Sequence, residues 1–426
     1  MSNRIKALLG EYPLIFSLWA SAAAFLSYFG MYMYRKPFTA GTYSEYSGFG
    51  MDYKSLLVIS QIIGYASSKF MGIKIISQMR QRQRVYYYIG CILISEFFLL
   101  LFSIYPYPLG GIFLALSAFP LGLIWGIVFQ YLEGRSITEI LTIMLSANFI
   151  LSSGIAKSLG NWLISQGIAE TAMPVFVGLI SLPLCFAAIW MLELLPNPTI
   201  EDIKKREERT HMCKSDRTKV LLTYGWLIFL ISISYIVLTA LRDIRDNFGI
   251  EIWNELGFPK ASKLYTLSEL VVTIFVLICL GVLYRIVNNF KALYMQLLML
   301  FVGILSLVGS TLCFLSDIIS PISWMMISGI GLFIPYILLN GMLFDRLISA
   351  FKIKANVGFL MYLVDTAGYA FSVIIIIWKS QNQHNNSWID FYTIFCISGG
   401  IFLFFLMILV LAEIHRKERK MYIQMQ

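Results

Sequence analysis

Two arginines at the ends of apolar segments are the residues best suited to bind an anion. Arg35 and Lys36 follow the apolar run that includes Tyr32, and Arg242 follows a second run in the other half of the chain. An arginine at membrane depth is costly unless an anionic group meets it. A guanidinium can offer two parallel, charge-assisted hydrogen bonds to phosphate or carboxylate. We therefore expect Arg35 and Arg242 to be paired ligands facing a shared anion-binding cavity.

Local neutralisation is the alternative for the second arginine. Arg245 lies one helical turn beyond Arg242 and could share its role, but Asp243 and Asp246 could instead neutralise both arginines. Arg35 and Arg242 could also extend toward the outer headgroups as interfacial anchors.

The composition requires an integral membrane protein. Of 426 residues, 58% are hydrophobic and only 13% are charged, which is too apolar for a soluble domain. The apolar stretches approach the roughly 20 residues of a membrane-spanning helix and lack the alternation of barrel strands. We predict an all-α protein with twelve transmembrane helices, near residues 12–34, 54–77, 85–105, 109–132, 137–165, 173–195, 220–241, 264–284, 292–316, 321–344, 356–378 and 391–413.

The distribution of basic residues predicts that both termini are cytoplasmic. This orientation places 22 of the 33 Lys and Arg residues on the cytoplasmic side and 8 outside, with Lys69, Lys74 and Lys157 inside helices, as the positive-inside rule requires. The net charge of +9 therefore reflects topology in a plasma or cytoplasmic membrane. Basic clusters would meet the headgroups of the lipid bilayer, and they lack the aromatic interleaving that suits nucleic acid. No obligate protein partner is evident.

A polar segment and an internal repeat divide the chain into two halves. The linker 196–219 separates a predicted N-terminal six-helix bundle, 1–195, from a C-terminal one, 220–426. The segment Pro120–Phe129 matches Pro335–Phe344 without a gap, with proline, glycine and phenylalanine at identical spacing. Two such pseudo-symmetric repeats with a site at their interface are the architecture of major facilitator transporters, which this chain resembles over its whole length. The resemblance implies alternating access.

Three short motifs narrow the resemblance. Tyr34-Arg35-Lys36-Pro37-Phe38 resembles the first-helix signature of the organophosphate:phosphate antiporter family, which carries glycerol 3-phosphate or hexose phosphates. Ser68-Lys69-Phe70 and the run Leu241–Phe248 are similar to later segments of that family. The resemblance implies that Arg35 and Arg242 form a phosphate clamp, with Lys69 as a supporting cation. The segment Ser77–Arg84 lacks the acid that the family usually has there, so we expect a divergent relative.

Other polar side chains on the predicted helices could line the site. Lys69 and Lys157 lie inside helices, where a lysine needs a partner or water. Tyr32, Tyr65 and Asn148 are further candidates, although tyrosines are so frequent here that many must serve packing.

Three intramembrane acids are candidate counter-ions or proton sites: Glu96, Glu269 and Asp365. Asp365 is the deepest and the best candidate for proton coupling. Structural pairing is the alternative for all three.

Enzyme chemistry is not expected. Gly154–Ser158 lacks the spacing of a phosphate-binding loop, and no soluble segment could house an ATPase. The cysteines have no metal-ligand spacing, and we expect neither metal nor cofactor. The prediction is a secondary transporter of a small anionic solute, a phosphate ester or other organic anion exchanged for phosphate. The alternatives are a proton-coupled carrier of a sugar, peptide or drug, and a non-transporting sensor.

Overall fold

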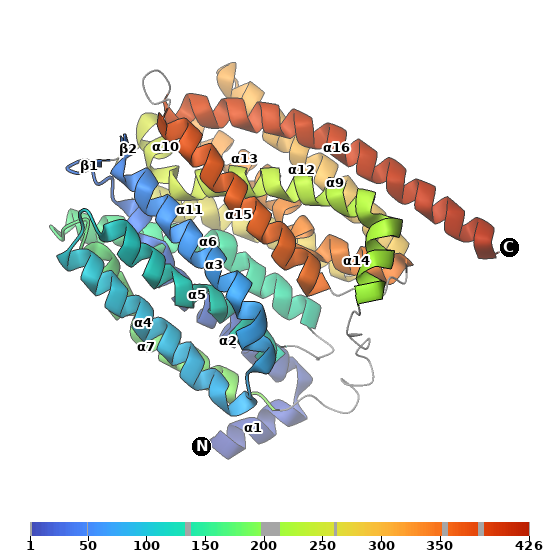
Figure 1. The fold of residues 1–426 in the computed structure, drawn as a ribbon, viewed down its shortest axis with the longest axis horizontal. Helices are drawn as coiled ribbons and strands as arrows, with labels where there is room; N and C mark the ends of the chain where they lie inside the picture. The colour runs from blue at the N-terminus through green and yellow to red at the C-terminus, as the bar shows by residue number, and fades with distance from the viewer. Residues whose placement is uncertain are drawn as a thin grey trace. The chain divides into compact units, whose positions relative to one another are not determined.

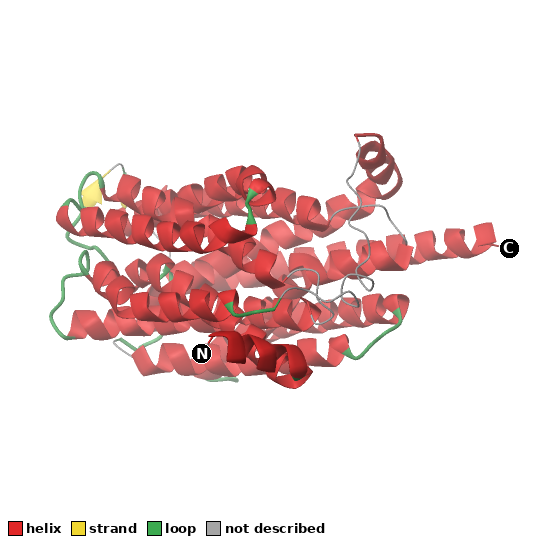
Figure 2. Ribbon diagram, turned by 90° about the horizontal axis from the view of Figure 1, so that it is seen from below, coloured by secondary structure: helices red, strands yellow, loops and turns green. Residues whose placement is uncertain are grey.

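A computed structural model describes residues 2–48, 50–132, 138–196, 214–259, 262–351, 357–381 and 387–425. Helices account for most of the described chain, as Figure 2 shows. Contacts divide it into two compact units. Of the predicted linker, residues 197–213 lie outside the described residues, and residues 214–219 belong to a helix.

Unit 1 comprises Met1–Glu207 and Phe258–Leu270. Its helices are α1 (Ser2–Glu11), α2 (Pro13–Arg35), the short η1 (Pro37–Ala40), α3 (Tyr53–Gln78), η2 (Gln81–Gln83), α4 (Arg84–Ile104), α5 (Gly110–Leu132), α6 (Thr138–Ser165), α7 (Met173–Glu193) and the beginning of α11 (Ser262–Tyr284). The two-residue strands β1 (Ser47–Gly48) and β2 (Met51–Asp52) pair antiparallel.

Unit 2 comprises Glu208–Gly257 and Val271–Gln426. Its helices are α9 (Lys214–Asn247), α10 (Gly249–Glu255), the rest of α11, α12 (Asn289–Leu315), α13 (Pro321–Ile337), the π-helical η3 (Leu338–Met342), α14 (Leu343–Phe351), α15 (Val357–Gln381) and α16 (Trp388–Met425).

Close packing through glycine brings α3 against α5 in unit 1, where Figure 1 shows the two helices side by side. A Cβ atom added at Gly64 would overlap the carbonyl of Ala115, and one added at Gly122 would overlap the hydroxyl of Ser68. Small residues let membrane helices approach until their backbones touch. The two glycines therefore fix the turn of α3 between Gly64 and Ser68.

The helices confirm an all-α membrane protein. In the described part of the chain, nine helices are long and apolar enough to cross a membrane. The nine do not include α3, α6 and α15, which hold Lys69, Lys157 and Asp365 respectively.

One predicted boundary needs correction. The span expected to end near Arg242 continues as α9 to Asn247. Arg242 and Arg245 are therefore inside a helix, because the polar run from Arg242 to Asn247 keeps helical geometry while its side chains are buried in unit 2.

The internal repeat has different local structures in the two units. In unit 1 the segment after Pro120 stays α-helical through α5. In unit 2 the equivalent segment after Pro335 widens into the π-helical turn η3. Single π-helical turns are frequent at functional sites. The sequence match therefore does not extend to the geometry of the helix backbone.

Candidate functional site

Arg35 lies over an aromatic ring in unit 1. It is the last residue of α2, and its side chain is buried, with 4% of the residue exposed. Its guanidinium carbon is 3.6 Å from the centroid of the Tyr65 ring. The backbone carbonyl of Arg35 accepts a hydrogen bond from the side-chain amide of Gln61 on α3. The end of α2 is thus held to α3 by both side chain and backbone.

A second cation and two further tyrosines surround the same ring. The Lys69 ammonium is 5.2 Å from the Tyr65 centroid, and both cations fall within the roughly 6 Å range of cation–π attraction. The Tyr65 hydroxyl lies 3.2 Å from that of Tyr28. Tyr28 in turn packs edge-on against Tyr32, with centroids 5.5 Å apart. We call Arg35, Lys69, Tyr65, Tyr28 and Tyr32 the Tyr65 cluster.

The packing of α3 against α5 positions the Tyr65 cluster. Tyr65 follows Gly64, and its backbone carbonyl accepts a hydrogen bond from the Ser68 hydroxyl. Gly64 and Ser68 both lie at the close contact with α5. The Tyr65 ring therefore stands on a part of α3 that has little freedom to move.

The remaining unit 1 candidates lie on α6 and beside it. Lys157 is buried, with 7% exposed. The side chain of Glu269 on α11 lies against Gly154, one turn before Lys157, and Thr266 donates a 2.7 Å hydrogen bond to Ser158. Asn148 is fully buried and accepts a 2.5 Å hydrogen bond from Ser152 on its own helix. Glu269 is thus placed close to a buried lysine.

Arg242 is paired within unit 2. Its Nε and Nη2 atoms donate to the same carboxylate oxygen of Asp243, at 3.1 Å and 2.5 Å. Its Nη1 atom donates to the hydroxyl of Tyr336 on α13. The guanidinium also lies over the rings of Tyr336 and Tyr369, at 4.5 Å and 5.6 Å from their centroids. The sequence left open whether Arg242 is an anion ligand or is neutralised locally by an aspartate. The structure pairs it with Asp243.

Hydroxyl groups link Arg242 to Asp365. The Tyr235 hydroxyl donates to Asp365 and lies 3.2 Å from the Tyr336 hydroxyl. Tyr235 is the donor in both contacts, and since a hydroxyl has one hydrogen, it can donate to only one of the two oxygens at a time. The Tyr336 oxygen accepts from Arg242 and, at 3.2 Å, from Asn340 in η3. Two tyrosine hydroxyls thus connect the guanidinium of Arg242 to the carboxylate of Asp365.

Arg245 faces a different part of unit 2. Its Nη1 atom is 3.5 Å from the Ser328 hydroxyl and 3.8 Å from the Met325 sulfur on α13. A Cβ atom added at Gly329 would lie 2.8 Å from its Nη2 atom. Arg245 thus lies against the part of α13 from Met325 to Gly329.

Tyr235 and Tyr336 were missed by the sequence reasoning. Tyr235 lies seven residues before Arg242, so helical periodicity could have placed both on one face of α9. Tyr336 and Asn340 replace Leu121 and Trp125 of the internal repeat. Polar residues that break an otherwise apolar repeat were the available signal.

A carboxylate holds the loop that follows Arg35. Glu170 accepts hydrogen bonds from the backbone amides of Thr42 and Tyr43, at 3.0 Å and 2.6 Å. The Tyr43 hydroxyl donates to the carbonyl of Phe38 at 2.9 Å. Burial, and then the charge of Glu170, raise the pKa of Tyr43 well above its ordinary value, so this donor keeps its proton.

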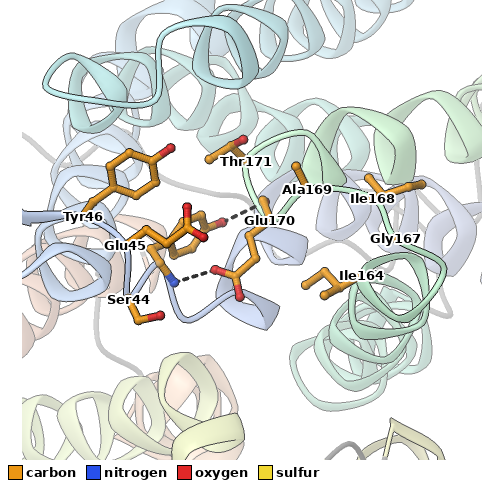
Figure 3. Close-up of a pocket in the computed structure, with 10 residues that line it drawn as sticks. Ser44, Glu45, Tyr46, Ile164, Gly167, Ile168, Ala169, Glu170 and Thr171 are labelled. Atoms are coloured by element: carbon orange, nitrogen blue, oxygen red, sulfur yellow. Dashed lines mark hydrogen bonds between the residues drawn. The ribbon is translucent and has the colours of Figure 1, made fainter.

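The same loop borders a cavity of about 370 Å³, shown in Figure 3. Ser44, Glu45 and Tyr46 line it together with the α6–α7 connection from Gly167 to Thr171. Glu170 also lines the cavity, and its carboxylate is hydrogen-bonded to the loop amides of Thr42 and Tyr43.

Glu96 stands apart from both arginines. It lies near the middle of α4, and its carboxylate packs on the Cα atom of Gly178 in α7, beside the ring of Tyr34. Both carboxylate oxygens are buried and have no hydrogen-bond partner among the described residues.

Solved transporters share this helical architecture. A D-xylose-proton symporter matches with a TM-score of 0.60 at 12% identity, covering 92% of this chain and 97% of the symporter. The nucleoside transporter NupG matches with a TM-score of 0.59 at 14% identity over 93% of this chain and 98% of NupG. A NupG point mutant gives 0.63 at 14% identity, over 92% and 99%. At these identities the likeness establishes the fold, which is that of the major facilitator transporters.

Within this fold class, the chain belongs to the family of unknown function DUF5690, which matches residues 37–417. No curated protein matches the sequence. The predicted kinship with the organophosphate:phosphate antiporters is not supported by these matches and stays a prediction.

Proposed function

We propose that the protein is a secondary transporter that binds a small organic anion at the Tyr65 cluster and works by alternating access. The observation that carries the proposal is the position of two cations, Arg35 and Lys69, over one tyrosine ring. Two like charges at one ring repel each other, and an anion between them would relieve that repulsion. The planar guanidinium of Arg35 suits phosphate and carboxylate groups in particular.

A phosphate ester exchanged for phosphate is the most specific form of this proposal. Such an ester carries close to two negative charges at neutral pH, which would match the charges of Arg35 and Lys69. The pairing of Arg242 with Asp243 changes its expected part in the clamp. An anion could recruit Arg242 only by competing with that carboxylate, so Arg35 is the stronger candidate ligand.

Exchange of labelled phosphate in proteoliposomes preloaded with phosphate tests the proposal. We expect exchange by the wild type and a loss of at least about tenfold in Arg35→Lys, since lysine keeps the charge but removes the bidentate fork. Arg84→Lys is a matched control, because Arg84 also lies over a tyrosine ring in unit 1, 5.1 Å from the centroid of Tyr131. It should leave exchange unchanged.

Several organic anions belong in the same assay as competitors. If neither phosphate nor any organic phosphate or carboxylate is exchanged or competes, while the protein remains folded, the anion proposal is wrong. Equal losses in Arg35→Lys and Arg84→Lys would assign the effect to stability rather than to binding.

A proton-coupled carrier of a polar solute such as a sugar or nucleoside is the second candidate. The chain of hydrogen bonds from Arg242 through Tyr336 and Tyr235 to Asp365 favours it. An acid held in such a chain within a membrane is a natural proton site. Uptake driven by an imposed pH gradient and lost in Asp365→Asn would support this candidate. Uptake that is indifferent to the gradient would exclude it.

A further inference from the structure

Glu96 is an acid in an apolar setting that neither proposed site uses. On its own helix the flanking residues Leu93, Phe97 and Leu100 are exposed, as expected for a face turned toward lipid. The Glu96 carboxylate turns instead toward α7, where it fills the space left by the missing side chain of Gly178. Any Cβ atom at Gly178 would overlap Oε2 of Glu96.

Among the residues that the structure describes, no cation pairs with this carboxylate. Neither oxygen accepts a hydrogen bond in the described part of the chain. The titratable groups beside it are Tyr34 of α2 and, next to Tyr34, Cys185 of α7, and both are neutral when protonated. An isolated carboxylate in such a medium is far more costly than the neutral acid.

Tyr34 is the group that could respond to a charge on Glu96. Its hydroxyl donates to the backbone carbonyl of Gly178 at 2.9 Å, and its ring passes the same Cα atom that the carboxylate contacts. An ionised Glu96 would compete with that carbonyl for the hydroxyl, because a charged acceptor makes the stronger hydrogen bond. Tyr34 directly precedes Arg35, so a change of its partner would reach the Tyr65 cluster.

We propose that Glu96 is a proton-binding site within the membrane: it rests as a neutral carboxylic acid, and its ionisation draws the Tyr34 hydroxyl away from Gly178. Release of the proton would thereby be linked to the end of α2. The protonation of Glu96 and its link to Tyr34 do not depend on which solute is carried.

Labelling with carbodiimides tests the resting state directly. An apolar carbodiimide reacts with protonated carboxyl groups inside a bilayer. With the full-length protein in liposomes at neutral pH, we expect peptide mass spectrometry to find Glu96 modified by dicyclohexylcarbodiimide. Glu193, which accepts a hydrogen bond from Tyr131 at the end of α7, should stay unmodified. Labelling at Glu96 by a water-soluble carbodiimide alone, or by neither reagent, would overturn the proposal.

Two hydroxyl variants test the link to Tyr34. In Tyr34→Phe the ionised acid has no hydroxyl to recruit, so labelling of Glu96 should persist to higher pH than in the wild type. Tyr88→Phe is the matched control, because the Tyr88 hydroxyl also donates a 2.9 Å hydrogen bond to a backbone carbonyl, that of Ser27. It should leave the pH profile unchanged. Identical profiles for Tyr34→Phe and the wild type would refute the link, and this readout needs no transport activity.

Discussion

At the scale of single residues, the ring of Tyr65 should matter more than its hydroxyl. Arg35 and Lys69 both lie over the ring, whereas the hydroxyl lies 3.2 Å from that of Tyr28. A desolvated cation–π contact contributes about 2 kcal/mol. We expect Tyr65→Leu to weaken anion binding by about tenfold or more and Tyr65→Phe to leave it within about threefold. The KM for exchange in proteoliposomes measures both.

Equal effects of the two substitutions would show that the hydroxyl contact with Tyr28, and not the ring, organises this part of the site. The ring variant also needs a folding control, which thermal unfolding in detergent supplies.

The carboxylate of Asp243 should contribute far more to stability than a charged group at the surface. Asp243 and Arg242 are both buried, with side chains 3% and 8% exposed. Removing one partner of a buried pair costs about 3 to 5 kcal/mol, because the other charge stays buried. We therefore expect Asp243→Asn to lower the unfolding temperature strongly. The double variant Arg242→Met with Asp243→Leu should recover much of the loss.

The matched control is the pair of Glu413 with Arg416, whose arginine side chain is 60% exposed. Arg416→Ala should cost at most about 1 kcal/mol. A double variant less stable than Asp243→Asn alone would contradict the argument from an uncompensated charge.

How far the sequence predicts the site differs from residue to residue. The sequence predicts Arg35, Lys69 and Asp365 at membrane depth, because ionisable residues are conspicuous in apolar segments. Which of them lie together does not follow. Asp243 is adjacent to Arg242 in the chain and could be suspected, but Tyr336 reaches Arg242 only through the packing of α13 against α9.

At the scale of helices, the contact between α3 and α5 should tolerate no added side chain. A Cβ atom at Gly64 would overlap the backbone of Ala115, which cannot turn aside as a side chain can. We expect Gly64→Ala to push the helices apart and to lower the unfolding temperature in detergent. Gly90→Ala on α4 is the control, since nothing lies within 4 Å of the added atom there. Equal stability of the two variants would contradict this packing.

Helix positions follow from hydropathy much better than helix ends and irregularities do. Each predicted span overlaps a helix, since about 20 apolar residues leave few other options. The end of α9 was placed too early, because a run of arginines and aspartates looks like an interface until its partners are known. The π-helical turn after Pro335 was not foreseen, because Pro120 sits in the same local sequence without one.

At the scale of the whole molecule, the distribution of basic residues predicts a definite orientation. Ser44 belongs to the loop after η1, and Lys420 is an exposed residue near the end of α16. We expect a cysteine at Ser44 to react with a membrane-impermeant maleimide in intact cells, and one at Lys420 to react only after permeabilisation. The reverse pattern would invert the proposed topology.

The division into halves was expected from a polar linker and an internal repeat, and the contacts give two units of which one includes Phe258–Leu270. The sequence could not assign that segment to unit 1. It follows α10 of unit 2 directly, and its place in unit 1 depends on contacts with helices far away in the chain. The major facilitator fold was expected from a resemblance based on the predicted spans and the internal repeat, and the solved structures that match it are only 12 to 14% identical in sequence.

The length of α9 has a mechanical consequence. The helix runs unbroken for 34 residues, or about 51 Å at 1.5 Å per residue, while the hydrocarbon core measures about 30 Å. Lys417 of α16 supports it near the start of its candidate membrane span, where it donates a 2.5 Å hydrogen bond to the Thr223 carbonyl and lies over the Tyr224 ring. Such a braced rod bends little. A tilt at its first turn, next to the linker, would be delivered almost undiminished to Arg242, so a force applied at one membrane face could be felt by a charge near the other.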